Sequence, residues 1–193
     1  MNHLVDLKEL SSMTISEATA LLKEKIKSAP HLGDLSVRDL ACMSIGRSKK
    51  DPVGIYIFGN DEGDIYYVGK THGRSLHERM ITHLDSRDPV PGSPHLAQLV
   101  SSQVKREKSL HRSDAVKRIL DMNMLWIAIP KSGLTKNEHQ RLIALVERRL
   151  LWCEALDPSF NSDRVKRNST ITIKGKKVDL LSESRLFSLS LSV

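Results

Sequence analysis

Two short apolar runs separated by a turn-forming segment constrain the fold more than any other part of the sequence. The runs are VGIYIF (residues 53–58) and IYYV (residues 65–68), and the segment GNDEG (residues 59–63) lies between them. β-branched and aromatic residues interrupted by Gly, Asn and Asp are typical of an antiparallel hairpin. A turn centred between Asp61 and Glu62 predicts that Tyr56 lies directly opposite Tyr67, so that two phenols share one sheet face. A three-residue loop or a bulge would shift that pairing by one residue.

A helix is expected soon after the second run. Leu76, Met80 and Leu84 follow one another at i, i+4 and i+8, which predicts a buried stripe on that helix. Arg79 and His83 are four residues apart and therefore project from one helix face. We expect that face to lie beside the tyrosines of the hairpin.

These residues together resemble the signature of the GIY-YIG endonuclease superfamily. The triplets at residues 54–56 and 67–69 are separated by ten residues, and Arg79 and His83 follow on the expected helix. Val68 stands where the second triplet of the family has isoleucine. The resemblance implies an α/β (α+β) fold in which a small, three-stranded, antiparallel central sheet is flanked by helices.

The family site is completed by a glutamate on a later helix and an asparagine shortly after it. Glu147, within the apolar helical segment 142–151, and Asn161 match these positions in order and setting, and the resemblance spans about residues 53–161. A carboxylate in an apolar stripe costs several kcal/mol unless it is paired or binds a metal. Residue pattern alone leaves two alternatives for Glu147, an ion pair with an arginine across the core and a metal ligand.

The resemblance assigns a role in phosphodiester hydrolysis to each matching residue. Tyr56 would be the general base, relieved of its proton by His83 or by a nearby cation, and Tyr67 would hydrogen-bond the attacking water or the phosphate. Lys70 and Arg79 would hold the scissile phosphate.

The remaining two roles concern the metal and its surroundings. Glu147 would ligate one Mg²⁺, for which Mn²⁺ would substitute, and Asn161 would orient the network. A single carboxylate completed by waters and phosphate oxygens suits Mg²⁺.

Outside the resemblance, the chain is expected to have three regions: a helical extension at residues 1–50, the nuclease core at 51–161 with a helical insertion at 85–122, and a β extension at 162–193. Helices are expected to begin at the capping boxes of Thr14, Ser36 and Thr135, and two more are expected at 94–103 and 113–122. The expected strands are a third core strand at 124–129, a hairpin at 170–180 and an edge strand at 186–193. The N-terminal helices are interpreted as a cover for the sheet or as a small DNA-contacting module. The insertion is interpreted as a substrate-selecting element or as a solvated helical pair.

Composition favours a nucleic-acid partner. The net charge is +7 with a pI near 9.5, and basic residues cluster in loops and at element ends. Cys42 and Cys153 are far apart and form no CxxC pair, which argues against a disulfide framework or zinc site. There is no apolar run of membrane-spanning length and no signal-peptide core, so we expect a cytoplasmic protein without a membrane partner.

Several functional alternatives stay open beside metal-dependent DNA cleavage. A P-loop around Lys70 is disfavoured because Asp64 stands where that motif requires glycine. The compact chain resembles type II restriction enzymes, which predicts sequence-specific cleavage of double-stranded DNA and leaves a homodimer open. A structure-specific repair or phage nuclease is the second reading, and a catalytically silent nucleic-acid-binding module is the alternative outside enzymes.

Overall fold

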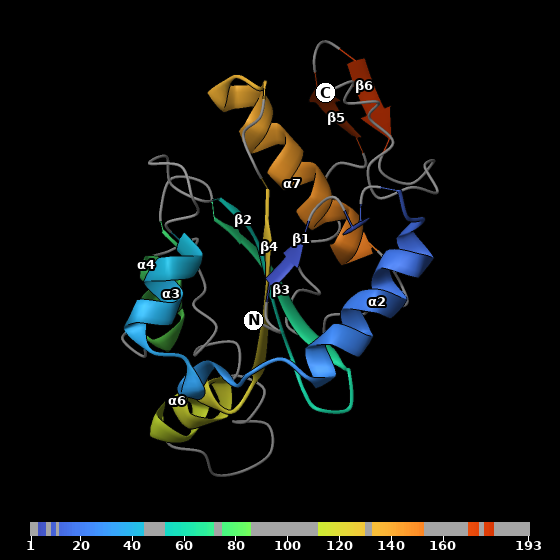
Figure 1. Cartoon of the computed structure of the whole chain (residues 1–193). Coiled ribbons are helices and arrows are strands. Elements are labelled where there is room, and N and C mark those ends of the chain that lie inside the picture. The colour runs from blue at the N-terminus through green and yellow to red at the C-terminus, as the bar shows by residue number, and fades with distance from the viewer. Residues whose placement is uncertain are drawn as a thin grey trace.

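The computed structural model describes the sheet, most of the helices and a C-terminal hairpin (Figure 1). The described residues are 4–6, 9–10, 12–44, 53–71, 75–85, 112–129, 133–152, 170–173 and 176–179. The expected helix at 94–103, the expected edge strand at 186–193 and Asn161 lie outside them. No helix within these ranges is long and apolar enough to cross a membrane.

The central sheet is mixed and has the strand order β1-β4-β2-β3. β4 (Asn123–Ala128), β2 (Gly54–Gly59) and β3 (Ile65–Thr71) pair antiparallel, and β1 (Leu4–Asp6) pairs parallel with β4. The three expected antiparallel strands are present, but the expected strand count was wrong. β1 has three residues, which is too short to show the alternation that identifies a strand in sequence.

The expected hairpin register was also wrong, by two residues. Tyr56 lies opposite Gly69, and Phe58 lies opposite Tyr67. One residue of the shift arises at the turn, where Gly59 pairs with Ile65, and the other at a bulge between Phe58 and Gly59. In the turn, the Asn60 side-chain oxygen accepts the backbone N–H groups of Glu62 at 3.1 Å and Asp64 at 2.8 Å. A two-residue shift preserves strand parity, so Tyr56 and Tyr67 still share one face, as expected.

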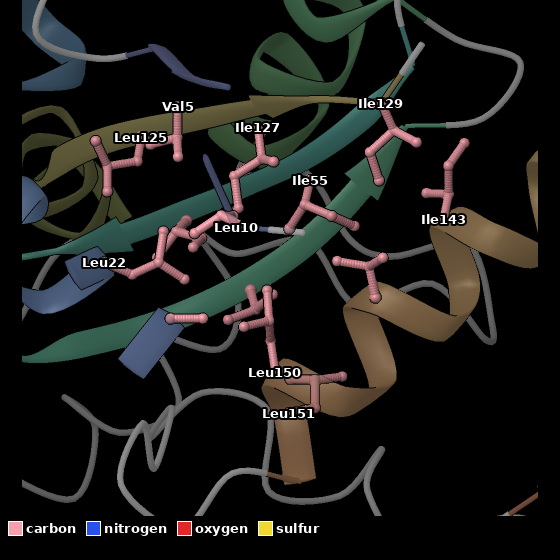
Figure 2. Packing of buried hydrophobic residues seen from close by; sticks show 14 of the residues in the cluster. Val5, Leu10, Leu22, Ile55, Leu125, Ile127, Ile129, Ile143, Leu150 and Leu151 are labelled. Carbon is pink, nitrogen blue, oxygen red and sulfur yellow. The ribbon is translucent and has the colours of Figure 1, made fainter. Parts of the chain in front are cut away.

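Helices cover both faces of the sheet (Figure 1). α2 (Ile15–Lys27) and α7 (Lys136–Trp152) pack on the face that carries Ile55, Ile57, Leu125 and Ile127, as Figure 2 shows for several of these residues. α3 (Val37–Ser44), α4 (Leu76–Leu84) and α6 (Arg112–Leu120) cover the other face, together with a 3-10 turn at Leu32–Asp34. Because both faces are buried, the strands read as continuous apolar runs.

The two faces of the sheet differ in chemistry. The face under α2 and α7 is aliphatic, whereas the face under α3, α4 and α6 carries mainly aromatic side chains: Tyr56, Phe58, Tyr67 and Trp126, with Met124. Consecutive residues of a strand alternate between the faces. Even-numbered residues of β2 therefore enter the aromatic layer and odd-numbered ones the aliphatic layer.

Capping boxes begin the helices where the sequence predicts them. The Thr14, Ser36 and Thr135 hydroxyls accept the backbone N–H groups of residues 17, 39 and 138 at 3.1–3.3 Å. Ser75 caps α4 in the same way, together with Glu78. α2 packs against the sheet, which agrees with the cover interpretation of the N-terminal helices.

The remaining elements lie close to their expected positions. α6 begins at Arg112 and α7 ends at Trp152. β5 (Thr170–Ile173) and β6 (Lys176–Asp179) form the expected C-terminal hairpin as a separate two-stranded sheet. The division of the chain into three regions stays a prediction.

Candidate active site

The side chain of Tyr56 crosses the edge strand of the sheet. Tyr56 is 0% exposed and lies on β2, opposite Gly69 of β3. A Cβ atom placed on Gly69 would lie 2.3 Å from both the Cζ atom and the hydroxyl of Tyr56. The phenol ring therefore lies directly over Gly69, and only glycine leaves room for it. The two glycine-containing triplets are thus linked physically, since the second glycine accommodates the first tyrosine.

Gly69→Ala is expected to expel the Tyr56 ring from its position. The added methyl group overlaps the ring, which is held by backbone on one side and aromatic packing on the other, so both stability and any Tyr56-dependent activity should fall. The loss of stability should reach about 1–3 kcal/mol, typical of overpacking. Gly133→Ala is the control, because nothing lies within 4 Å of its Cβ position and only its positive φ opposes the change. Urea unfolding of the two variants measures the difference.

The Tyr56 hydroxyl contacts two side chains of α4. His83 Nε2 lies 2.6 Å from the hydroxyl oxygen, and Arg79 Nη2 donates to the same oxygen at 3.5 Å. α4 is held against the sheet by Leu76 and Met80, both buried. The expectation that Arg79 and His83 share a helix face beside the tyrosines is confirmed.

The direction of these hydrogen bonds follows from the donors available. Arg79 can only donate, so the Tyr56 oxygen accepts from it, and the Tyr56 proton has His83 Nε2 as an acceptor in one tautomer of the imidazole. That tautomer is the neutral imidazole with its proton on Nδ1, and it satisfies the buried phenol O–H. The structure thus places a phenol proton in direct contact with an acceptor that can take it up.

Aromatic rings surround this contact and keep it dry. The Tyr67 ring lies 6.0 Å from the Tyr56 ring and 5.3 Å from the His83 ring, measured between centroids, and Phe58 lies 5.9 Å from Tyr56. Tyr56, Tyr67 and His83 are all buried. Arg79 is half-buried and therefore forms the solvent-accessible side of the cluster.

Burial raises the pKa of Tyr56 well above its ordinary value of 10.0. Desolvation of the phenolate is the main cause, the neighbouring Tyr67 adds to it, and Arg79 partly offsets it. The pKa of Arg79 is raised as well: its burial alone would lower the pKa, but the charge of and hydrogen bond to an ionised Tyr56, together with the charges of Tyr67 and Glu147, outweigh that effect. Tyr56 therefore keeps its proton at neutral pH.

The raised pKa of Tyr56 predicts a loss of stability at alkaline pH. Below pH 10 both folded and unfolded chains hold the neutral phenol, so the contribution is fully present. Above it the unfolded chain loses the proton first, and stability falls as pH rises toward the folded pKa. Unfolding measured at increasing pH should show this loss in the wild type, and Tyr56→Phe should show less of it. Equal pH dependence in both chains would contradict the assignment.

Lys70 and Glu147 form an ion pair on the other face of the sheet. Lys70 lies on β3 opposite Ile55, so its parity places it in the layer of α7, which carries Glu147. Lys70 Nζ donates to Glu147 Oε2, and the two side chains are 25% and 9% exposed. Of the two alternatives for Glu147, the ion pair is present in the structure, but the expected arginine partner was wrong, because a lysine on the edge strand reaches the carboxylate.

The two halves of the site interact around the edge strand. The charge of Glu147 raises the pKa of both Tyr56 and Arg79, although Glu147 comes from the opposite layer. Lys70 directly follows Gly69, over which the Tyr56 ring lies. We therefore treat the tyrosine cluster and the Lys70–Glu147 pair as one site at the β3 edge.

The described residues fit a metal site that is completed by waters and, in a complex, by the substrate. They contain no group of three or more His, Cys, Asp and Glu side chains that could hold an ion. Glu147 offers a single carboxylate, which suits Mg²⁺ because this ion commonly keeps several waters and takes phosphate oxygens as further ligands. A resident, fully protein-ligated ion does not fit this donor set.

Sequence reasoning missed the partnership of Lys70 with Glu147 and the role of Gly69 as a seat for Tyr56. Strand parity could have indicated the Lys70–Glu147 pair, because Lys70 is three residues after Tyr67 and must therefore point to the other face.

Comparison of the chain with protein-family models, with curated proteins and with solved structures finds no match. The functional argument therefore rests on the site itself.

Proposed function

We propose that this protein is a divalent-metal-dependent endonuclease that hydrolyses phosphodiester bonds of double-stranded DNA. The observation that carries the proposal is the 2.6 Å contact between the Tyr56 hydroxyl and His83 Nε2, with the guanidinium of Arg79 beside it. A buried phenol already bonded to a neutral imidazole suits proton transfer better than it suits packing alone.

Tyr56 acts as the base through a proton relay. Its raised pKa makes a standing phenolate costly, so it removes a proton from water as its own proton passes to His83 Nε2. The aromatic rings of Phe58 and Tyr67 exclude bulk water from this path. The proton of the attacking water therefore ends on the Tyr56 oxygen, and the former Tyr56 proton ends on His83 Nε2.

Arg79 holds the scissile phosphate next to the base. Its Nη2 donates to Tyr56, and its Nε is buried with no hydrogen-bond acceptor among the described residues. Buried donors are normally satisfied, and guanidinium donors match phosphate oxygens in geometry. A phosphate oxygen bound at Arg79 lies close to the hydroxyl that activates the water. The net charge of +7 favours binding of the rest of the DNA.

Glu147 is the residue that would hold Mg²⁺, or Mn²⁺ in its place. The bound cation would supply neutralisation of the charge that develops on the phosphate and on the leaving oxygen. Lys70 would contribute a second positive charge on the same side.

Sequence-specific cleavage by a restriction-type enzyme is the form of this activity that we favour. Two alternatives remain, and the first is a structure-specific repair or phage nuclease. A catalytically silent nucleic-acid-binding module is favoured by one observation, the Lys70–Glu147 pair, which neutralises the carboxylate without a metal.

A cleavage survey tests the proposal. Purified protein is incubated with duplex, branched and single-stranded DNA and with RNA, in Mg²⁺, in Mn²⁺ and in EDTA. We expect cation-dependent cleavage of duplex DNA that leaves 5′-phosphate and 3′-hydroxyl ends. Binding of DNA without cleavage of any substrate would establish the silent module instead, and preferred cleavage of branched DNA would establish the structure-specific reading.

A further inference from the structure

We propose that Lys70 and a divalent cation compete for Glu147, so that Lys70 is released toward the substrate only when the cation binds. The inference rests on the proposed function for the identity of the cation and of the substrate. It concerns the regulation of the site: in the metal-free protein, Lys70 would occupy the carboxylate of Glu147.

The geometry of the pair makes simultaneous occupancy unfavourable. Lys70 Nζ contacts Oε2 of Glu147, whose side chain is 9% exposed. An ammonium group and a divalent cation on one small, poorly solvated carboxylate repel each other, because the interaction of charges strengthens as the surroundings become less polar. Binding of the cation therefore favours departure of the lysine.

Burial explains why the carboxylate is never left unpaired. A buried carboxylate without a compensating charge is strongly unfavourable. In the absence of metal, Lys70 supplies this charge. Exchange of Lys70 for a cation therefore leaves Glu147 compensated in both states.

Lys70 is suited to such an exchange by its length and place. Its ammonium lies on a flexible four-carbon stem, and a quarter of the side chain is exposed, so Nζ can swing toward solvent without movement of β3. It follows Gly69, where the Tyr56 ring lies at the sheet edge. A released Lys70 adds its charge to that of Arg79 near the phosphate position.

This exchange couples the cation to the DNA. Cation binding adds two positive charges and frees the lysine, so it should increase affinity for a phosphate at the site. Coupling of two ligands is reciprocal, so DNA should increase cation affinity by the same factor. Metal-free protein is then expected to bind DNA through its other basic residues while the catalytic side is neutralised.

Mn²⁺ titration of Lys70→Met tests the competition directly. Electron paramagnetic resonance of free Mn²⁺ measures affinity without DNA, and the variant removes the competing charge at similar side-chain length. We expect Mn²⁺ affinity to rise about tenfold over wild type. Arg79→Met is the matched control: it removes one positive charge that interacts with Glu147 but does not contact it. Unchanged or weaker binding in Lys70→Met, or the same increase in both variants, would overturn the inference.

Lysine labelling of the wild-type chain gives a second test that does not depend on folding of the variant. Reductive methylation followed by mass spectrometry measures the reactivity of each amine with and without saturating Mn²⁺. We expect Lys70 to react about fivefold faster or more when Mn²⁺ is present. Lys27 is the control, because its pair with Glu24 at 3.0 Å is exposed and distant in sequence from the site. Lys70 reactivity that Mn²⁺ leaves unchanged, or failure of the wild type to bind Mn²⁺, would contradict the exchange.

Both readouts are independent of DNA cleavage. A chain that binds Mn²⁺ and exposes Lys70 but cleaves nothing supports the exchange and overturns the nuclease proposal. A chain that cleaves DNA in Mn²⁺ while Lys70 reactivity stays constant supports the nuclease and overturns the exchange.

Discussion

Tyr56→Phe is expected to lower DNA cleavage by about 10²-fold or more and to leave DNA affinity nearly unchanged. The change deletes only the hydroxyl, whose oxygen lies 2.6 Å from His83 Nε2. The ring keeps its position over Gly69 and its stacking on Tyr67, so the fold should be retained. Single-turnover cleavage with Mg²⁺, with binding measured in Ca²⁺, separates the chemical step from affinity.

Tyr66→Phe is the matched control for this substitution. Tyr66 is the neighbour of Tyr67 on β3, and its hydroxyl accepts a hydrogen bond from Asn60 Nδ2 at 2.8 Å in the hairpin turn. The Tyr66→Phe protein also loses a phenol hydroxyl, but at a position outside the site, so it should cleave DNA at the wild-type rate. A Tyr56→Phe protein as active as Tyr66→Phe would remove Tyr56 from the proposed mechanism.

Glu147→Gln is expected to abolish cation-dependent cleavage while the folded protein still binds DNA. The amide keeps the shape of the side chain, and because Lys70 is a quarter exposed, water can solvate its ammonium when the carboxylate is absent. The reverse change should behave differently. Lys70→Met leaves a buried carboxylate uncompensated and should cost about 3–5 kcal/mol of unfolding free energy in EDTA.

Urea unfolding of both variants measures this asymmetry. If Glu147→Gln proves as unstable as Lys70→Met and cleavage is lost through unfolding, the pair has a structural role and Glu147 is not a metal ligand. If Glu147→Gln is stable and fully active, the carboxylate is outside the chemistry altogether.

Local signals in the sequence predict the helices well. The capping boxes at Thr14, Ser36 and Thr135 act within three residues of each helix start, so their outcome depends little on the rest of the fold. The shared helix face of Arg79 and His83 follows from helical periodicity alone. These two residues meet Tyr56 as expected because the hairpin and α4 are close in sequence as well as in space.

Features that depend on contacts between distant residues or on individual side chains could not be predicted from the sequence. The hairpin register depends on a bulge between Phe58 and Gly59 and on a turn that the Asn60 side chain organises, and composition reveals neither. β1 is defined by its pairing with β4, more than a hundred residues away. The partner of Glu147 depends on which edge-strand residue faces α7. That residue is a lysine, and a lysine can serve either as a phosphate ligand or as a counter-ion.

The pH dependence of cleavage in wild type and His83→Ala tests the central claim most directly, because it follows the proton that Tyr56 gives up. With His83 present, the single-turnover rate should rise with pH until the imidazole is neutral and then level off. Without it, the reaction should be slower at neutral pH and should continue to rise toward pH 10, since Tyr56, whose pKa is raised well above 10.0, must lose its proton unaided. A His83→Ala protein with the wild-type pH profile would contradict the relay and leave Arg79, the cation that contacts the Tyr56 hydroxyl, as the group that activates Tyr56.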